Sequence, residues 1–165
     1  MISFAAKYKN GPITIRFPRG KSFFYNKKSK FKPGSARIIK KGTSLTIINF
    51  GALLHEILEA VKIIGDKNKI EIIDARFAKP IDEKTIIKSI NKTKKVIIVE
   101  EGVIEGGFGD SVLRMMVKHN LKNVKIKQMG VPDRFIEHGT IEQCRQECGL
   151  SKSDFIKAIN EFLNN

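Results

Sequence analysis

The sequence predicts an α/β domain with a mostly parallel, open sheet and helices on both faces, and two observations predict it. From about Arg37 onward, short apolar runs alternate with single helical patterns. Strands separated by single helices cannot pair as hairpins and need crossover connections. The runs are also almost continuously Ile and Val, as expected for strands that are buried on both faces.

The elements of this domain follow one another as strand, helix, strand. The expected strands are Leu45–Phe50, Ile70–Asp74, Val96–Glu100 and Val124–Met129. The expected helices between them are Leu53–Ile64, Asp82–Ile90 and Asp110–His119. Two more helices close the chain, and each begins at a capping pair: Thr140 with Gln143, and Ser151 with Asp154. Residues Arg37–Gly42 can add an extra edge strand that turns back at Gly42.

The segment before this domain has a different character. Met1–Tyr8 can be the end of a helix, and the alternation in Ile13–Phe17 predicts a strand. Gly20–Ser35 is rich in lysine and has no period, which indicates a surface linker.

Positive charge is concentrated in that first segment. The net charge is +14, but no acidic residue occurs before Glu56, whereas twelve basic residues do. The rest of the chain carries only +2. Lysine outnumbers arginine 24 to 7, whereas proteins that read DNA or RNA depend on arginine and on aromatic stacking. Nucleic-acid binding is therefore disfavoured, and a stand-alone basic binding protein stays only an alternative.

The ordinary composition indicates a folded protein inside the cell. The chain is 41% hydrophobic, and no apolar run approaches the roughly 20 residues that a membrane span needs. The two cysteines, Cys144 and Cys148, are far too few for a disulfide framework. We expect a cytoplasmic protein.

Candidate binding residues lie at the carboxyl ends of the strands, where open parallel sheets hold ligands. Asp74, Glu100 and Glu101 can hold Mg²⁺, but helix capping and pairing with Arg76, Lys79 or Arg134 is the favoured interpretation, because no repeated metal-ligand spacing is present. Gly106–Gly109 can receive an anion at a helix start, although a tight strand-to-helix turn explains it better.

Other candidates are weaker or lie elsewhere. A zinc site at Cys144 and Cys148 with His138 lacks another ligand, so packed thiols are favoured. Arg16 and Arg19 flank Phe17-Pro18 in the first segment, where a proline-fixed turn suits an arginine that grips phosphate. A solvated basic turn is an equal alternative there.

Several motifs carry a resemblance to a known family. Gly11–Gly20 resembles the end of the middle, pyrimidine-binding domain of transketolase-type thiamine-diphosphate enzymes. Asp74–Asp82, Val99–Gly102 and Gly106–Gly109 resemble the C-terminal domain of the same family. Val131–Thr140 (VPDRFIEHGT) is more specific and resembles the 1-deoxy-D-xylulose-5-phosphate synthases. The likeness covers nearly the whole chain and is weakest in the lysine-rich linker.

This resemblance implies a domain plan. Residues 1–20 would be the remnant of the middle domain, 21–36 a linker, and 37–165 the C-terminal domain. It also implies a homodimeric transferase of isoprenoid and thiamine biosynthesis that condenses pyruvate with D-glyceraldehyde 3-phosphate, with loss of CO₂. Thiamine diphosphate and Mg²⁺ would serve the full-length enzyme. Among substrate-binding residues, Arg19 would contact the substrate phosphate, with Arg16 as a less supported neighbour.

The chain departs from the family in what it lacks. The diphosphate and Mg²⁺ motif and the cofactor-activating glutamate belong to earlier regions that this sequence does not contain. We therefore expect a C-terminal portion that is inactive alone and binds no cofactor, with the missing domains as its partners. Three alternatives stay open: a dimerisation module, a regulatory-ligand module at Gly106–Gly109, and the C-terminal domain of a transketolase or of a 2-oxoacid dehydrogenase β subunit.

Overall fold

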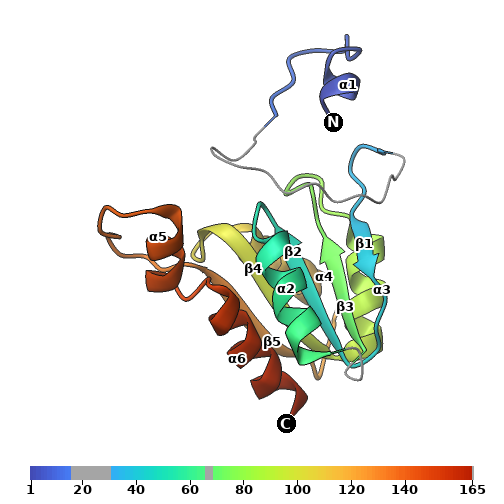
Figure 1. Cartoon of the computed structure of the whole chain (residues 1–165). Coiled ribbons are helices and arrows are strands. Elements are labelled where there is room, and N and C mark those ends of the chain that lie inside the picture. Colours follow the sequence, from blue (N-terminus) through green and yellow to red (C-terminus); the bar gives the residue numbers. More distant parts are fainter. Residues whose placement is uncertain (16–30, 66–68, 165) are drawn as a thin grey trace. The chain divides into compact units, whose positions relative to one another are not determined.

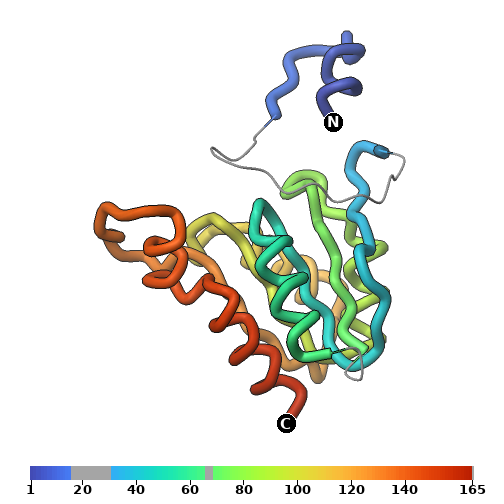
Figure 2. The backbone as a smooth tube through the Cα atoms, viewed as in Figure 1, coloured from blue at the N-terminus to red at the C-terminus, as the bar shows by residue number. Residues whose placement is uncertain are grey.

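The computed structural model describes residues 1–15, 31–65 and 69–164 (Figures 1 and 2). The chain divides into two compact units, Met1–Pro33 and Gly34–Asn165. The first unit contains the short helix α1 (Ile2–Ala5), and the ring of Phe4 lies 5.7 Å from that of Tyr8 and 5.4 Å from that of Phe31. No described helix has the length and apolar character that a membrane span requires.

The second unit is built on a five-stranded sheet with the order β1-β3-β2-β4-β5. The strands are β1 (Arg37–Lys40), β2 (Leu45–Phe50), β3 (Ile70–Asp74), β4 (Lys95–Val103) and β5 (Lys125–Val131). The pairs β2–β3, β2–β4 and β4–β5 are parallel, and only β1 runs antiparallel, against β3. The predicted mostly parallel sheet and its extra edge strand are both confirmed.

Helices cover the two faces of this sheet (Figure 1). The helices are α2 (Leu54–Ile64), α3 (Glu83–Thr93), α4 (Phe108–Lys118), α5 (Ile141–Glu147) and α6 (Lys152–Leu163). On one face, Ile47 and Ile97 of the central strands pack with α2 and α6. On the other, Ile48 and Ile98 pack with α3 and α4. Successive strand residues point to opposite faces, so these alternating apolar side chains hold helices on both sides.

The predicted bounds hold closely, with informative exceptions. β2 and β3 have the predicted ends, and both closing helices begin at full capping boxes, at Thr140 and Ser151. α4 begins at Phe108, two residues before the predicted Asp110, because its first turn is held by hydrogen bonds to Glu100 that the sequence pattern does not reveal.

The strand predicted at Ile13–Phe17 is not formed over Ile13–Ile15, and this part of the prediction is wrong. A strand needs a partner for its backbone hydrogen bonds, and the described residues of the first unit provide none. Arg16 and Phe17, and most of the predicted linker, lie outside the described residues.

Candidate functional site

The candidate ligand site is the carboxyl edge of the sheet between β2 and β4. The chain leaves β2 toward α2 on one face and leaves β4 toward α4 on the other. At such a reversal of the connections, open α/β sheets bind their ligands. Two consecutive glutamates at the end of β4, Glu100 and Glu101, lie at this point.

The Glu100 carboxylate caps the N-terminus of α4. Its side chain is buried, and its two carboxylate oxygens accept hydrogen bonds of 2.8 Å from the backbone N–H groups of Phe108 and Gly109. A helix N-terminus attracts negative charge, so Glu100 takes the place that an external anion would take. A side chain at Gly107 would collide with this carboxylate and with the carbonyl of Val103. The glycine loop is therefore a tight turn built around the protein's own carboxylate.

Glu101 serves the helix on the opposite face. Its Oε2 accepts a 2.9 Å hydrogen bond from the N–H of Ala52, just before α2, and its Oε1 accepts one of 3.1 Å from Arg145 of α5. Arg145 also lies 3.8 Å from Glu56 of α2. Pairing with an arginine was predicted, but Arg145 was not among the predicted partners. Sequence order gave no indication of it, because α5 and β4 meet only in the folded chain.

The third carboxylate, Asp74, lies with different partners. It forms a 3.6 Å ion pair with Arg76, which confirms one predicted pairing. Burial raises the pKa of the Asp74 carboxyl, and the nearby charges of Arg76 and Arg37 only partly oppose this effect. Arg76 itself has a positive φ of 61°, which is uncommon for a residue with a side chain.

One polar atom at this edge has no partner. Asn49, at the end of β2, is fully buried, and its Nδ2 donates to the carbonyl of Gly51 at 3.0 Å. Among the described residues, its Oδ1 is the one buried side-chain acceptor without a hydrogen bond. An unsatisfied buried acceptor costs free energy, about 1–3 kcal/mol.

The structure does not assemble a metal site from the predicted candidates. Over residues 1–15, 31–65 and 69–164, no three His, Cys, Asp or Glu side chains come together in a way that could hold a metal ion. The magnesium hypothesis for Asp74, Glu100 and Glu101 and the zinc hypothesis for the two cysteines gain no support. Cys144 and Cys148 are free thiols, and the thiol of Cys144 donates to the carbonyl of Glu137 at 3.8 Å.

The predicted phosphate-binding residues, Arg16 and Arg19, lie outside the described residues. His119 interacts with Glu83 at 2.7 Å, across α4 and α3, and this contact together with Lys118 lowers the pKa of the Glu83 carboxyl.

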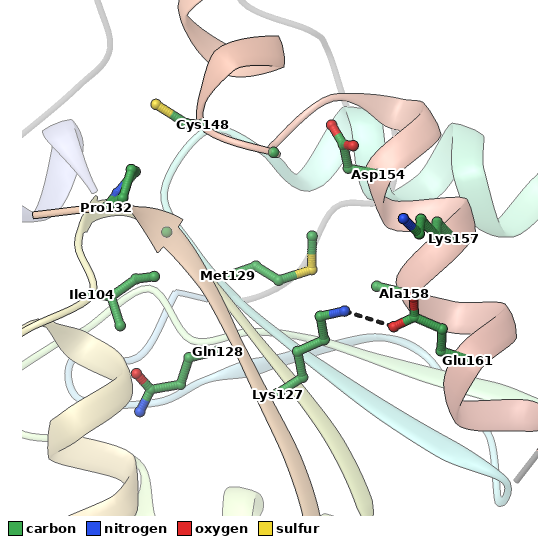
Figure 3. Close-up of a pocket in the computed structure, with 12 residues that line it drawn as sticks. Ile104, Lys127, Gln128, Met129, Pro132, Cys148, Asp154, Lys157, Ala158 and Glu161 are labelled. Atoms are coloured by element: carbon green, nitrogen blue, oxygen red, sulfur yellow. Dashed lines mark hydrogen bonds and ion pairs between the residues drawn. The ribbon is translucent and has the colours of Figure 1, made fainter. Parts of the chain in front are cut away.

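An open groove of about 310 Å³ runs between edge strand β5 and α6 (Figure 3). Lys127 of β5 and Glu161 of α6 face one another across it in a 2.7 Å ion pair. Asp154, also on its wall, accepts a hydrogen bond of 3.0 Å from the N–H of Ser151 and so caps α6. The two carboxylates that line this groove are thus already engaged.

Comparison with known protein families assigns this chain to one of them. The sequence model described as "Transketolase, C-terminal domain" matches residues 34–154. The chain belongs to this transketolase C-terminal domain family. The predicted family is thereby confirmed, and the match begins at the first residue of the second compact unit.

Individual relatives of this transketolase C-terminal domain protein are more specific. It is 34% identical over 163 residues to the 1-deoxy-D-xylulose-5-phosphate synthase of Bacillus licheniformis, covering 96% of this chain and 26% of that protein. It is 34% identical over 167 residues to the synthase of a Geobacillus species, covering 99% of this chain and 26% of that protein. The chain thus spans about a quarter of the length of these curated relatives.

Solved structures agree on the fold. A chain described as "Split gene transketolase, inactive beta4 tetramer" superposes with a TM-score of 0.73 and 26% identity, covering 82% of this chain and 44% of that one. The transketolase of Campylobacter jejuni superposes with a TM-score of 0.54 at 16% identity, which supports the fold alone.

Proposed function

We propose that this chain is the C-terminal part of a 1-deoxy-D-xylulose-5-phosphate synthase. The observation that carries this proposal is the extent of the match to the synthases. It covers 96% to 99% of the chain and so includes much of the basic segment before residue 34, to which the family model does not extend. That extent favours the predicted domain organisation, in which residues 1–20 are the end of a middle domain, 21–36 are a linker and 37–165 are the C-terminal domain.

The whole enzyme would join pyruvate to D-glyceraldehyde 3-phosphate, release CO₂ and form 1-deoxy-D-xylulose 5-phosphate. Thiamine diphosphate would supply the carbanion chemistry, with Mg²⁺ on its diphosphate. The described residues do not suit the binding of thiamine diphosphate and Mg²⁺. They assemble no metal-ligand cluster, and Glu100 and Glu101 already cap the helices that follow β4 and β2. The cofactor would therefore be held by other domains of a cytoplasmic homodimer.

The contribution of this chain would be packing and dimerisation together with one contact to the substrate. Arg19, which stands between Pro18 and Gly20 in the sequence, would bind the phosphate of glyceraldehyde 3-phosphate through paired N–H groups. Arg16 is the second, less supported candidate.

A chimera tests this function. This chain would replace the matched C-terminal region of the Bacillus licheniformis synthase, and turnover of pyruvate with glyceraldehyde 3-phosphate would be measured. We expect the chimera to turn over and this chain alone to show no activity. A folded chimera that holds thiamine diphosphate but gives no product would contradict the proposal, as would turnover by the isolated chain.

A second candidate is the C-terminal part of a transketolase. The 26% identity to the split-gene transketolase favours it, although the synthases are more similar at 34%. The same chain placed on a transketolase core discriminates the two, because only the matching core should recover activity.

A further inference from the structure

Residues 132–149 form an arm between β5 and α6 that buries none of its side chains. All 18 residues, including α5, are exposed or only half-buried, whereas the next residue, Leu150, is buried in the core. Phe135 is 85% exposed and Ile141 is 52% exposed. Both ends of the arm, Pro132 and Cys148–Gly149, line the groove between β5 and α6, where Figure 3 labels Pro132 and Cys148.

Polar contacts help to hold the arm in shape. Arg134 pairs with Glu147 at 2.7 Å, and Arg145 reaches Glu101 at 3.1 Å on the body of the domain. Thr140 starts α5 with a capping box. Ordering a residue costs about 1–2 kcal/mol of conformational entropy, and surface ion pairs return little of it. A segment of this kind gains little hydrophobic energy within its own domain and is only weakly stabilised there.

Phe135 is the most exposed large apolar side chain of the arm. An aromatic ring held on an ordered loop can fill a pocket of a partner with little loss of conformational freedom. Two large exposed apolar side chains on a segment that buries none of its own favour a contact with another protein.

The charge of the arm indicates the character of its partner. The arm carries four acidic and two basic residues, a net charge of −2, on a chain of +14. Both of its arginines are already paired, and no ion pair is found within the described chain for Asp133, Glu137 or Glu142. The complementary surface would therefore combine an apolar pocket with a basic rim.

We propose that the arm is the docking surface by which this domain holds another domain of the same enzyme, with Phe135 as its anchor. The inference rests on the proposed function: the chain spans about a quarter of its relatives, so most of the enzyme's surface lies on domains outside this sequence. A second copy of the chain is the competing occupant, and the test separates the two.

Hydrogen exchange of the arm tests the proposal in two settings. In the full chain alone, amides of 141–147 should exchange rapidly and independently of protein concentration. In the chimeric synthase they should exchange at least tenfold more slowly, and Phe135→Ser should remove that protection. Val117→Ser is the matched control, because Val117 is 78% exposed on α4, away from the arm. Phe135→Ser should leave the unfolding temperature of the chain unchanged, since the ring is exposed.

Each outcome has one meaning. Equal exchange in chain and chimera overturns the docking surface, even if the chimera is active and the proposed function stands. Protection in the chain alone that is lost on dilution or with Phe135→Ser assigns the arm to a second copy and also overturns the proposal. Protection in a chimera that binds cofactor but does not turn over supports docking while the proposed reaction fails.

Discussion

At the residue scale, the end of β4 shows how two identical side chains acquire different tasks. Glu100 and Glu101 are neighbours in sequence, and the alternation of a strand sends them to opposite faces. One caps α4 through the N–H groups of Phe108 and Gly109, and the other caps the approach to α2 at Ala52. Together they close the place where a related architecture would bind an anion.

Replacing Glu100 with Gln should destabilise the domain by about 2 kcal/mol, because the amide retains only one acceptor for two buried N–H donors and loses the charge at the helix start. Urea unfolding of the full chain measures the change. Glu105→Gln is the matched control, since Glu105 is exposed and should change stability by less than about 0.5 kcal/mol. Equal stability of the two variants would show that the cap contributes nothing.

Asp74 gives a pH-dependent prediction. Because burial raises its folded-state pKa, the native state holds this proton more tightly than the unfolded chain does. The stabilising contribution of the group is therefore full below its ordinary pKa and is lost as pH rises through the folded value. Relative to Asp74→Asn, the wild type should lose stability in urea unfolding as pH rises above the ordinary pKa of an aspartate. A difference that stays constant, or grows toward acid, would contradict this assignment.

Arg19→Ala in the chimeric synthase should raise the KM for glyceraldehyde 3-phosphate by about tenfold or more, since a charge-assisted phosphate contact contributes roughly 1.5–3 kcal/mol. The KM for pyruvate, which has no phosphate, should change little. Arg16→Ala serves as the comparison three residues earlier in the sequence. A larger effect at Arg16 would reassign the contact, and no effect at either would remove it.

At the scale of elements, a buried polar cluster joins β2, β3 and α3. Glu71 of β3 is 2% exposed and contacts both Lys92 and Ser89 of α3. Thr46 of β2 continues the cluster, 2.7 Å from Ser89 and 2.9 Å from Thr93. These contacts hold α3 on the sheet beside the apolar layer.

Lys92→Met should destabilise the domain by about 1–2 kcal/mol, because it removes the charged partner of the buried Glu71 carboxylate, while the Lys92 side chain is itself 36% exposed and Ser89 still contacts Glu71. Thermal and urea unfolding measure the loss. Lys88→Met is the control on the same helix, because Lys88 is exposed like Lys92, and among the described residues the ion pair with Glu71 is made by Lys92. The double variant Glu71→Met with Lys92→Met should recover part of the stability, whereas a further loss would show that the pair itself is stabilising.

At the scale of the whole molecule, charge and fold divide at different places. The boundary between the compact units lies between Pro33 and Gly34 in the sequence, whereas the run of basic residues without acidic ones continues to Lys41. The second unit has its own sheet, its own helices and a core on both faces.

Residues 34–165 should therefore fold alone, with an unfolding temperature within about 2 °C of the full chain, since a domain with its own core does not need a flanking segment. Calorimetry of both proteins measures the difference. Circular dichroism of the shortened protein checks that its secondary structure is intact. Loss of cooperative unfolding on truncation would show that the first unit is part of the same folding domain.

Much of the fold could be predicted, and the misses have a common cause. The Ile and Val runs predicted β2 and β3 to the residue, and the capping pairs predicted the starts of α5 and α6. The failed strand at Ile13–Ile15 depended on a partner that local alternation does not specify. The carboxylates at the sheet edge were found, but the arginine of α5 that meets Glu101 was not.

The glutamates at the end of β4 illustrate which features the sequence determines by itself and which depend on the tertiary structure. Periodicity, capping and turn chemistry are local, so the sequence by itself determined the α/β class, most element bounds and, through its motifs, the family. The strand order, the exposed arm at Phe135 and the closure of the anion sites by Glu100 and Glu101 depend on residues far apart in sequence. Only the tertiary structure decided these, because packing alone brings such residues into contact.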